Sequence, residues 1–267
     1  MSEYIFGSTA KELLRLELQA ELFEPYTKHT LELAGIKKGM KCVDFGCGNG
    51  YTAILLAKLV GKDGKVIAID TSKDALLVAE KNAKRLGIDN IEFIQTDAYN
   101  TSLKDNYYDL IFSRFLFTHI SEPKKVLEEM IRITKDNGII VTEDFNHELR
   151  ITYPYNKYIE RLRTALIELL KKSGSKYDIA GMLYRLFKEH GLDAKVDVYA
   201  VPFSMNDKRY RVLPLLFAEV LRDRFMKYGI IDEEEYNNII NGINEYMNIK
   251  DAIVLYSSVF RVYAYLI

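Results

Sequence analysis

The sequence predicts an α/β fold built on a doubly wound, parallel sheet, and two observations carry this prediction. Strand-like apolar runs alternate with helical stretches between residues 41 and 145, a pattern typical of a parallel sheet covered by its crossover helices. In addition, the strand at 41–45 enters a loop with three alternating glycines, Gly46, Gly48 and Gly50, and a helical stretch follows at once. A strand, a glycine-rich turn and a helix in this order hold nucleotide-like cofactors in open α/β sheets.

The elements of the first half follow from periodicity and turn residues. Residues 11–23 have a helical pattern that we expect Pro25 to end, and residues 25–34 form a second helix with Gly35 beyond it. The following predicted elements are strand 41–45, helix 50–60, strand 65–70, helix 73–86, strand 91–96, strand 108–113, helix 123–134 and strand 138–143.

After residue 150 the alternation gives way to a mainly helical stretch. Asp232 and Glu235 open the last helix with an arrangement similar to a capping box. The predicted elements are helices 154–172 and 178–190, a strand at 194–202, helices 210–228 and 233–247, and a β-rich segment at 252–266. Because the sequence has no internal repeat, low-complexity tract or linker, we predict one domain over residues 1–267.

Composition and charge favour an enzyme of the cytoplasm. The 267 residues include 37 basic and 38 acidic side chains, so the chain has no electrostatic footprint for nucleic acid. No apolar run approaches the roughly 20 residues that span a bilayer, and the first residues lack a secretion signal. Cys42 and Cys47 lack metal-ligand spacing, and we interpret them as free thiols in a reducing compartment. We therefore expect neither a nucleic acid nor a membrane as partner; the oligomeric state stays open.

Asp44 indicates the charge of the cofactor. The glycine spacing is G-x-G-x-G, whereas the dinucleotide fingerprint is G-x-G-x-x-G, and Tyr51 stands where that pattern continues. A carboxylate two residues before the first glycine would oppose a pyrophosphate. An ammonium or sulfonium group on the ligand would instead be stabilised there.

Carboxylates also follow three further strands, at what we expect to be the ligand-binding edge of the sheet. Asp70 ends the second strand, 20 residues after Gly50, where an acid accepts hydrogen bonds from ribose hydroxyls. Asp97 follows the third strand, and Glu143 and Asp144 follow the fifth. Such an edge favours a cationic ligand.

The stretch D-F-G-C-G-N-G, residues 44–50, resembles motif I of the class I S-adenosylmethionine-dependent methyltransferases without departures. Weaker matches at 4–7, 12–19, 178–183 and 229–234 resemble a branch that methylates small molecules. The resemblance implies a Rossmann-like, seven-stranded sheet whose last strand is antiparallel, with helical decoration in the C-terminal half. It also implies an N-terminal helical lid (1–38), a cofactor-binding core (39–150) and acceptor-side helices with the last two strands (151–267).

This resemblance implies S-adenosylmethionine as cofactor and S-adenosylhomocysteine as product, with a small-molecule acceptor and no metal. Within it, Asp97 contacts the adenine amino group, and Gln19 reaches the cofactor from the N-terminal helix. The cofactor-binding residues that we predict are Tyr4, Gln19, Asp44, Gly46, Cys47, Gly48, Asp70, Thr71, Asp97, Ala98, Ser113 and Arg114.

Methyl transfer needs alignment and exclusion of water, and a general base only when the acceptor is protonated. His119, in the loop after the fourth strand, is our first candidate base, and Glu143 is the second. Both also have structural interpretations, as a capping residue and as part of a capped loop. Aromatic side chains that can line an acceptor site or belong to the core are Phe115, Phe117, Tyr153 and Tyr155.

Alternatives stay open at this point. A methyltransferase for quinone rings fits the same motifs, and a protein or RNA methyltransferase is a more distant alternative. An NAD(P)-dependent oxidoreductase is disfavoured by Asp44, and a non-catalytic cofactor-binding regulator is compatible with the sequence. The acceptor atom is open among O, N, C and S.

Overall fold

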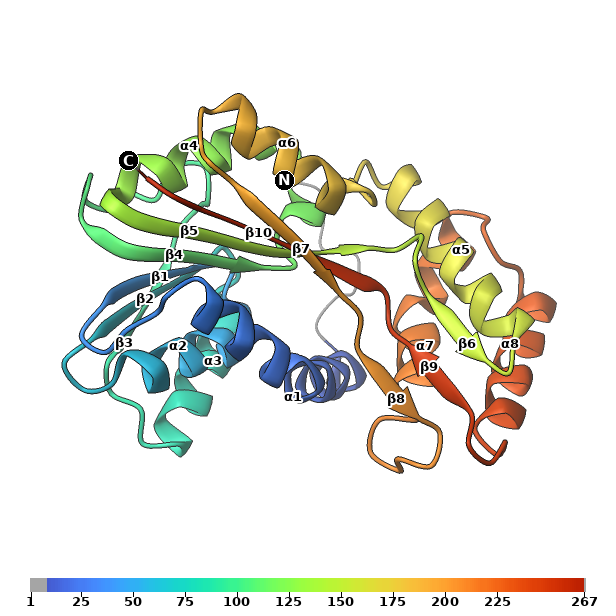
Figure 1. Cartoon of the computed structure of the whole chain (residues 1–267). Coiled ribbons are helices and arrows are strands. Elements are labelled where there is room, and N and C mark those ends of the chain that lie inside the picture. Colours follow the sequence, from blue (N-terminus) through green and yellow to red (C-terminus); the bar gives the residue numbers. More distant parts are fainter. Residues whose placement is uncertain (1–8, 267) are drawn as a thin grey trace.

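The computed structural model describes residues 9–266, and it confirms the predicted α/β sheet. Among these residues, seven strands form the central sheet in the order β3-β2-β1-β4-β5-β10-β7 (Figure 1). Strands β1 to β5 are parallel, and β10 runs antiparallel to both β5 and β7, as the resemblance implied. The strands are β1 Lys41–Phe45, β2 Lys65–Asp70, β3 Ile91–Gln95, β4 Tyr108–Arg114, β5 Thr134–Asn146, β7 Lys195–Tyr199 and β10 Ser258–Tyr265.

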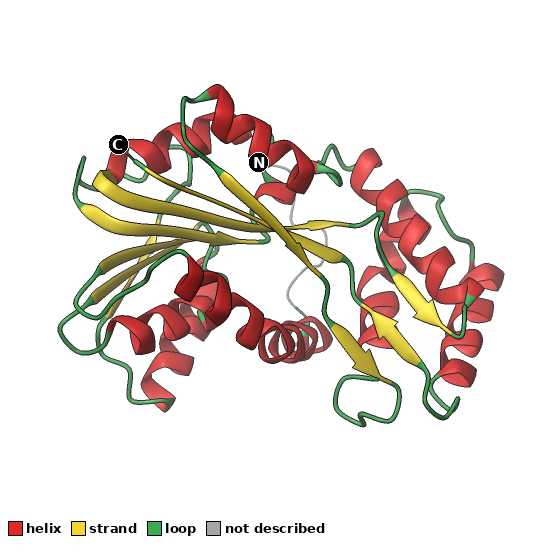
Figure 2. Cartoon of the chain, viewed as in Figure 1, coloured by secondary structure: helices red, strands yellow, loops and turns green. Residues whose placement is uncertain are grey.

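Helices cover both faces of this sheet (Figure 2). The apolar sides of α2 and α3, with the C-terminal end of α1, pack on one face, and those of α4 and α6 pack on the other. The helices are α1 Ala10–Leu33, α2 Tyr51–Val60, α3 Lys73–Arg85, α4 Pro123–Ile133 and α6 Ile179–Glu189, with a short 3₁₀ turn, η1, at Phe117–His119.

A second, smaller sheet, which the sequence patterns do not predict, extends the structure beyond the carboxyl edge of the central sheet. Strands β5, β7 and β10 are each connected by a few residues to a short strand, and these short strands form a separate sheet in the order β6-β9-β8. We call this part the cap lobe (residues 151–172 and 202–255). Its elements are β6 Ile151–Tyr153, β8 Pro202–Ser204, β9 Ile253–Leu255, α5 Lys157–Lys172, α7 Leu213–Lys227 and α8 Glu233–Tyr246.

Helix α1 joins the cap lobe to the central sheet. Its residues Leu18, Leu22 and Phe23 belong to the same apolar core as α5, α7 and β9. The prediction of two helices separated at Pro25 is wrong, because α1 is continuous from residue 10 to residue 33. Pro25 removes one backbone hydrogen bond, but the fully buried Phe23 and Thr27 on either side hold the helix against the protein.

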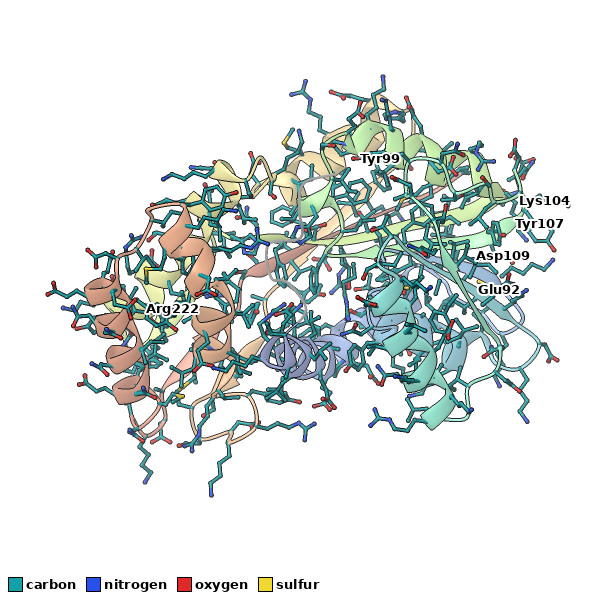
Figure 3. All side chains as sticks on the ribbon, turned by 180° about the vertical axis from the view of Figure 1, so that it is seen from behind. Glu92, Tyr99, Lys104, Tyr107, Asp109 and Arg222 are labelled. Carbon is teal, nitrogen blue, oxygen red and sulfur yellow. The ribbon has the colours of Figure 1, made fainter. Side chains whose placement is uncertain are left out.

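The amino ends of the strands carry ordinary surface contacts and define the edge opposite the glycine loop. Tyr107, immediately before β4, accepts a hydrogen bond from Lys41 (2.7 Å), and Lys104 lies over its ring. Figure 3 shows Lys104, Tyr107 and Glu92 together at this end, far from Arg222 in the cap lobe. A ligand site is therefore expected at the other edge, between the sheet and the cap lobe.

Gly242 is a stability determinant of the cap lobe. A Cβ atom at this position of α8 would overlap the ring of Tyr158 in α5. We expect Gly242→Ala to lower the free energy of unfolding by ~2 kcal/mol or more, because the overlap outweighs the better helix propensity of alanine. The matched control is Gly181→Ala in α6, where a Cβ meets no described atom within 4 Å. Urea unfolding should show the control to be as stable as the parent or more so; equal destabilisation of both variants would contradict this account.

Candidate active site

The glycine loop after β1 is packed on one side and open on the other. Gly46, Gly48 and Gly50 have φ angles of 68°, 50° and 80°, a region that favours glycine. A Cβ on Gly50 would lie 2.7 Å from Cβ of Ala79, so α3 packs directly against the loop there. Around Gly48, in contrast, no described atom lies within 4 Å of an added Cβ. The backbone at Gly48 is thus available to a ligand.

Asp70 fixes the shape of this loop. One of its carboxylate oxygens accepts a hydrogen bond from the Gly48 amide (2.9 Å), and the other accepts one from the Ser72 amide (2.9 Å). Because each carboxylate oxygen has two acceptor sites, Asp70 retains capacity for further donors such as hydroxyl groups. It therefore connects the end of β2 to the loop and still faces a ligand position.

Asp44 carries a buried oxygen that nothing in the described chain satisfies. Its side chain is 1% exposed, and Oδ2 has no hydrogen-bond partner among residues 9–266. Burial raises the pKa of Asp44 to about 8, Arg114 opposes this rise, and Asp70 adds to it. A buried carboxylate oxygen without a partner is costly, and a cationic ligand group would relieve that cost. The site therefore fits a cofactor with an ammonium group.

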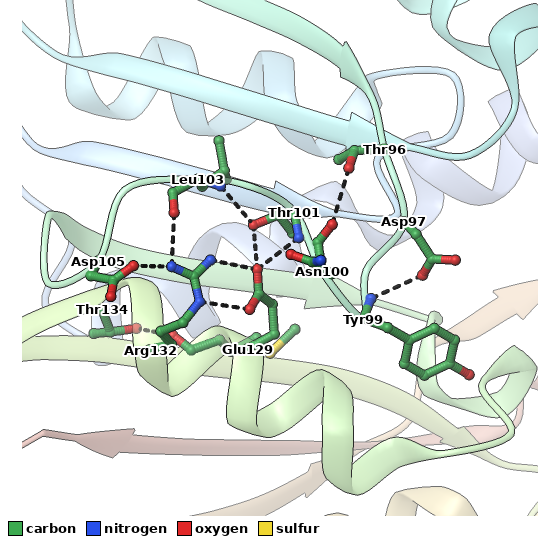
Figure 4. A network of polar contacts seen from close by, with 11 residues as sticks. Thr96, Asp97, Tyr99, Asn100, Thr101, Leu103, Asp105, Glu129, Arg132 and Thr134 are labelled. Carbon is green, nitrogen blue, oxygen red and sulfur yellow. Dashed lines mark hydrogen bonds and ion pairs between the residues drawn. The ribbon is translucent and has the colours of Figure 1, made fainter.

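The predicted cofactor residues on the next strands lie at the same edge of the sheet. Asp97 accepts a hydrogen bond from the Tyr99 amide (2.9 Å) within the loop that follows β3 (Figure 4). Ser113, at the end of β4, has a buried Oγ with no partner in the described part of the chain. Cys47 and Ala98 are buried, and Thr71 is exposed next to Asp70.

Figure 4 also shows what holds the loop after β3. The amide and hydroxyl of Thr101 both donate to Glu129 of α4, at 2.7 and 2.5 Å. Arg132 donates to the same carboxylate from the other side and to the carbonyl oxygen of Leu103. This network anchors the loop that carries Asp97 to a helix of the core.

Gln19 lies on α1 and contacts the connection between β9 and β10. Its Oε1 accepts hydrogen bonds from Arg15 (2.5 Å) and from the hydroxyl of Tyr256 (3.3 Å). Arg15 is itself paired with Glu12 (2.6 Å). Cofactor binding by Gln19 stays a prediction, and Tyr4 lies outside the described residues.

Four charged side chains share one register across the sheet and alternate in sign. They are Arg114 on β4, Glu143 on β5, Arg261 on β10 and Asp197 on β7. Arg261 is buried and lies 3.5 Å from Asp197.

Glu143, the second candidate base, is the buried acidic residue among these four charged side chains. The hydroxyls of Thr27 (2.7 Å) and Thr30 on α1 donate to its two oxygens, and Arg114 also donates to Thr27. Both oxygens of Glu143 are therefore engaged in attaching α1 to the sheet. A role in proton transfer stays a prediction.

We expect Glu143→Gln to lower the free energy of unfolding by ~2–4 kcal/mol, because Arg114 and Arg261 lose the charge between them. The matched control is Glu92→Gln, which removes an exposed ion pair with Lys65 and should cost less than ~1 kcal/mol. If Glu143 only attaches α1 to the sheet, Glu143→Gln lowers kcat/KM and leaves the pH profile of kcat unchanged. Loss of one titration step from that profile would instead identify Glu143 as the base.

His119, the first candidate base, lies at the end of η1, the short turn that follows β4 in the chain. Burial and the nearby charge of Arg15 lower its pKa to about 4, so its imidazole is neutral and weakly basic at pH 7. Asp144 holds η1 in place by accepting hydrogen bonds from the Phe117 amide (2.8 Å) and the Thr118 hydroxyl (2.6 Å). The catalytic role of His119 stays a prediction.

An aromatic cluster lies where β4, β5 and β10 leave the central sheet. Phe115 and Phe145 stack with ring centroids 3.9 Å apart, and Phe23 of α1 meets both rings and Tyr256 edge-on. Phe115 has φ 60°, an uncommon conformation for a bulky residue, and such strain is concentrated at functional sites. The aromatic cluster (Phe23, Phe115, Phe145 and Tyr256) thus adjoins the cofactor edge.

Of the four aromatic residues considered from sequence, only Phe115 belongs to this cluster. Phe117 is fully buried against α4 and α6, and Tyr153 and Tyr155 are 70% and 73% exposed on the cap lobe. Phe145 follows the acidic pair at the end of β5, a signal that sequence reasoning overlooked. Tyr256 carries no signal in its local sequence, because only the fold brings it to this edge.

Residues 9–266 contain no group of three or more His, Cys, Asp or Glu side chains arranged to hold a metal ion. Within the same residues, no helix is long and apolar enough to cross a membrane.

Comparison with known proteins agrees with this geometry. A family model described as "Methyltransferase domain" matches residues 36–210. The chain is 30% identical over 193 residues to demethylmenaquinone methyltransferase of Geobacillus stearothermophilus, covering 68% of this chain and 81% of that protein. It is 27% identical over 178 residues to the demethylmenaquinone methyltransferase of Staphylococcus aureus strain MRSA252, covering 65% and 73%.

Solved structures show the same relationship. A SAM-dependent methyltransferase from Aquifex aeolicus superposes with a TM-score of 0.56 at 26% identity, covering 73% of this chain and 94% of that one. The YcgJ protein from Bacillus subtilis, at 18% identity and a TM-score of 0.58 over 89% and 98% of the two chains, shares the fold. The chain therefore belongs to the methyltransferase domain family, as a class I S-adenosylmethionine-dependent methyltransferase.

Proposed function

We propose that this enzyme transfers the methyl group to a small, planar and mainly apolar acceptor held at the aromatic cluster, between α1 and the cap lobe. The observation that carries this proposal is the position of Phe115, whose ring stacks on Phe145 immediately beyond the end of β4. Aromatic faces bind planar rings well. Relatives that act on demethylmenaquinone support a ring as the acceptor, and a quinone-type ring is our preferred class.

The cofactor residues have separate roles in this proposal. Asp44 takes the ammonium group, Asp70 takes the ribose hydroxyls, and Asp97 takes the adenine amino group. Gly48 leaves the backbone accessible, since no described atom would meet a side chain there. The bound cofactor supplies an electrophilic methyl group on a sulfonium. The remaining work of the chain is to align the acceptor and exclude water.

Proton removal, where the acceptor needs it, falls to His119 or Glu143. The neutral imidazole of His119 can accept a proton but is a weak base, since its pKa is about 4. An acceptor that is already ionised would need no such base. We also place the enzyme in the cytoplasm, because Cys42 and Cys47 are buried free thiols.

The test is a methylation assay with S-adenosylmethionine and a panel of acceptors: naphthohydroquinones kept under reducing conditions, a peptide mixture and a mixed RNA. We expect a mass increase of one CH2 on a naphthohydroquinone and none on peptide or RNA. The variant Phe145→Ala should lose most of this activity while retaining S-adenosylhomocysteine binding. Methylation of peptide or RNA alone would overturn the proposal.

A further inference from the structure

We propose that Arg150 binds an anionic oxygen group on the acceptor, so that the preferred acceptor is a planar ring bearing a carboxylate or an ionised hydroxyl. This inference rests on the proposed function, because it places the ring at the aromatic cluster. Arg150 is then a specificity-determining residue, and the preferred acceptor carries a negative charge.

Arg150 lies in the connection between β5 and β6, six residues beyond Asp144, where the chain passes from the central sheet to the cap lobe. Its guanidinium lies over the rings of Tyr256 (5.0 Å) and Phe217 (5.8 Å). Tyr256 belongs to the aromatic cluster, and its ring is 5.6 Å from Phe145. Arg150 therefore borders the aromatic cluster at Tyr256.

Among the described residues, Arg150 has no counter-ion. In the part of the chain that the structure describes, its side chain makes no ion pair, and its buried Nε donates to no acceptor. The carboxylate that influences it most is Glu160, which already receives two hydrogen bonds from Arg163 (2.9 and 2.5 Å). A partly buried guanidinium without an acceptor is unfavourable, and an anionic ligand would satisfy it.

The charges of Arg150 and Arg163 both act on His147, which lies in the same connection. Burial lowers the pKa of His147 to about 3, and the charges of Arg150 and Arg163 contribute to this fall. Burial likewise lowers the pKa of the Arg150 guanidinium, and Arg163 adds to that effect. Glu160 acts on Arg150 but is already hydrogen-bonded to Arg163, and Glu148 acts on Arg163. Of these two guanidinium groups, Arg150 is therefore the one without a hydrogen-bonded carboxylate in the described chain, and this favours a negative charge on the ligand.

The chemistry of the ligand follows from this arrangement. In this proposal, an acceptor ring held at the aromatic cluster lies within reach of Arg150, whose guanidinium already lies over the ring of Tyr256. The fork of N–H groups on a guanidinium pairs with a carboxylate in two parallel hydrogen bonds and also stabilises a single ionised oxygen. A ring carboxylate and an ionised ring hydroxyl both present an anionic oxygen on a planar ring, and the binding experiment distinguishes these two groups.

The experiment measures binding of ring probes to the full-length protein saturated with S-adenosylhomocysteine, by titration calorimetry. The probes are 2-naphthoate, 4-nitro-1-naphtholate at pH 8, and the neutral 2-naphthamide. We expect at least one of the two anions to bind at least ~10-fold more tightly than the amide. Tighter binding of 2-naphthoate identifies a carboxylate as the preferred group; tighter binding of the naphtholate identifies a ring hydroxyl.

The variant Arg150→Met should abolish this preference and leave the affinity for 2-naphthamide within ~3-fold of the parent. Its affinity for S-adenosylhomocysteine, measured in parallel, reports on folding of the site. Arg185→Gln is the matched control, because Arg185 is an exposed arginine on α6, and it should keep the preference.

Three results would overturn the inference in distinguishable ways. Equal binding of anions and amide by the parent removes the role of charge and leaves the proposed function intact. A preference retained in Arg150→Met assigns the charge recognition to another residue. Absence of binding by all three probes contradicts the planar acceptor itself and the inference with it.

Discussion

The variant Asp44→Asn is expected to bind S-adenosylhomocysteine at least ~30-fold more weakly than the parent and to be more stable without ligand. The loss of affinity follows because asparagine cannot pair with an ammonium group, and removal of one partner of a buried charge pair costs about 2–5 kcal/mol. The gain in stability follows because the cofactor-free protein buries a carboxylate oxygen without a partner. We expect the free energy of unfolding at pH 8 to rise by ~1–3 kcal/mol.

The pH dependence of stability provides an independent check on the same residue. Burial raises the pKa of Asp44 in the folded protein to about 8, well above the value of an unfolded chain. The folded state therefore holds this proton more tightly, so Asp44's contribution to stability is full at low pH and is lost as the pH rises toward 8. Urea unfolding of the cofactor-free parent at pH 6 and pH 8.5 should show this loss. If the free energy of unfolding of Asp44→Asn depended on pH as that of the parent does, the effect would belong to other groups.

A pair of glycine substitutions separates the packed side of the cofactor loop from its open side. Gly50→Ala is expected to lower the free energy of unfolding by ~3 kcal/mol or more, because its Cβ would lie 2.7 Å from Cβ and 3.1 Å from Cα of Ala79, at a φ of 80°. Gly48→Ala meets no described atom and carries only the strain of its φ of 50°, ~1 kcal/mol.

The two variants should therefore differ in which property they lose. Gly48→Ala is expected to remain folded at 25 °C and to bind S-adenosylhomocysteine at least ~10-fold more weakly, because the added methyl group occupies the open side of the loop. Gly50→Ala should show its main defect in urea unfolding. If Gly48→Ala binds the cofactor product as well as the parent does, the ligand does not approach this side of the loop.

The core of the fold could be predicted because its signals are local. Each strand of β1 to β4 is a short apolar run bounded by turn residues, and the glycine loop after β1 specifies a strand-turn-helix unit within ten residues. The continuity of α1 could not be predicted in this way. Pro25 locally favours a break, and only the burial of Phe23 and Thr27 against distant elements overrides it.

The candidate site likewise has one part with local sequence signals and one part without them. Asp44, Gly48 and Asp70 lie within one βαβ unit, so their spacing alone places them together at the cofactor edge. The proposed acceptor side would be assembled from α1, the β5–β6 connection and the segment before β10, which are far apart in the sequence. Arg150 and Tyr256 therefore carried no local signal, and their contact exists only in the folded chain.

Titration calorimetry of the parent protein with S-adenosylhomocysteine, and in parallel with NADH and NADPH, tests the central claim most directly. The account predicts micromolar binding of S-adenosylhomocysteine at one site per chain, with loss of that binding in Asp44→Asn, and no binding of either nicotinamide cofactor. Binding of NADH or NADPH at this site, or undiminished binding of S-adenosylhomocysteine by Asp44→Asn, would contradict the assignment of the glycine loop and Asp44 to a cationic cofactor.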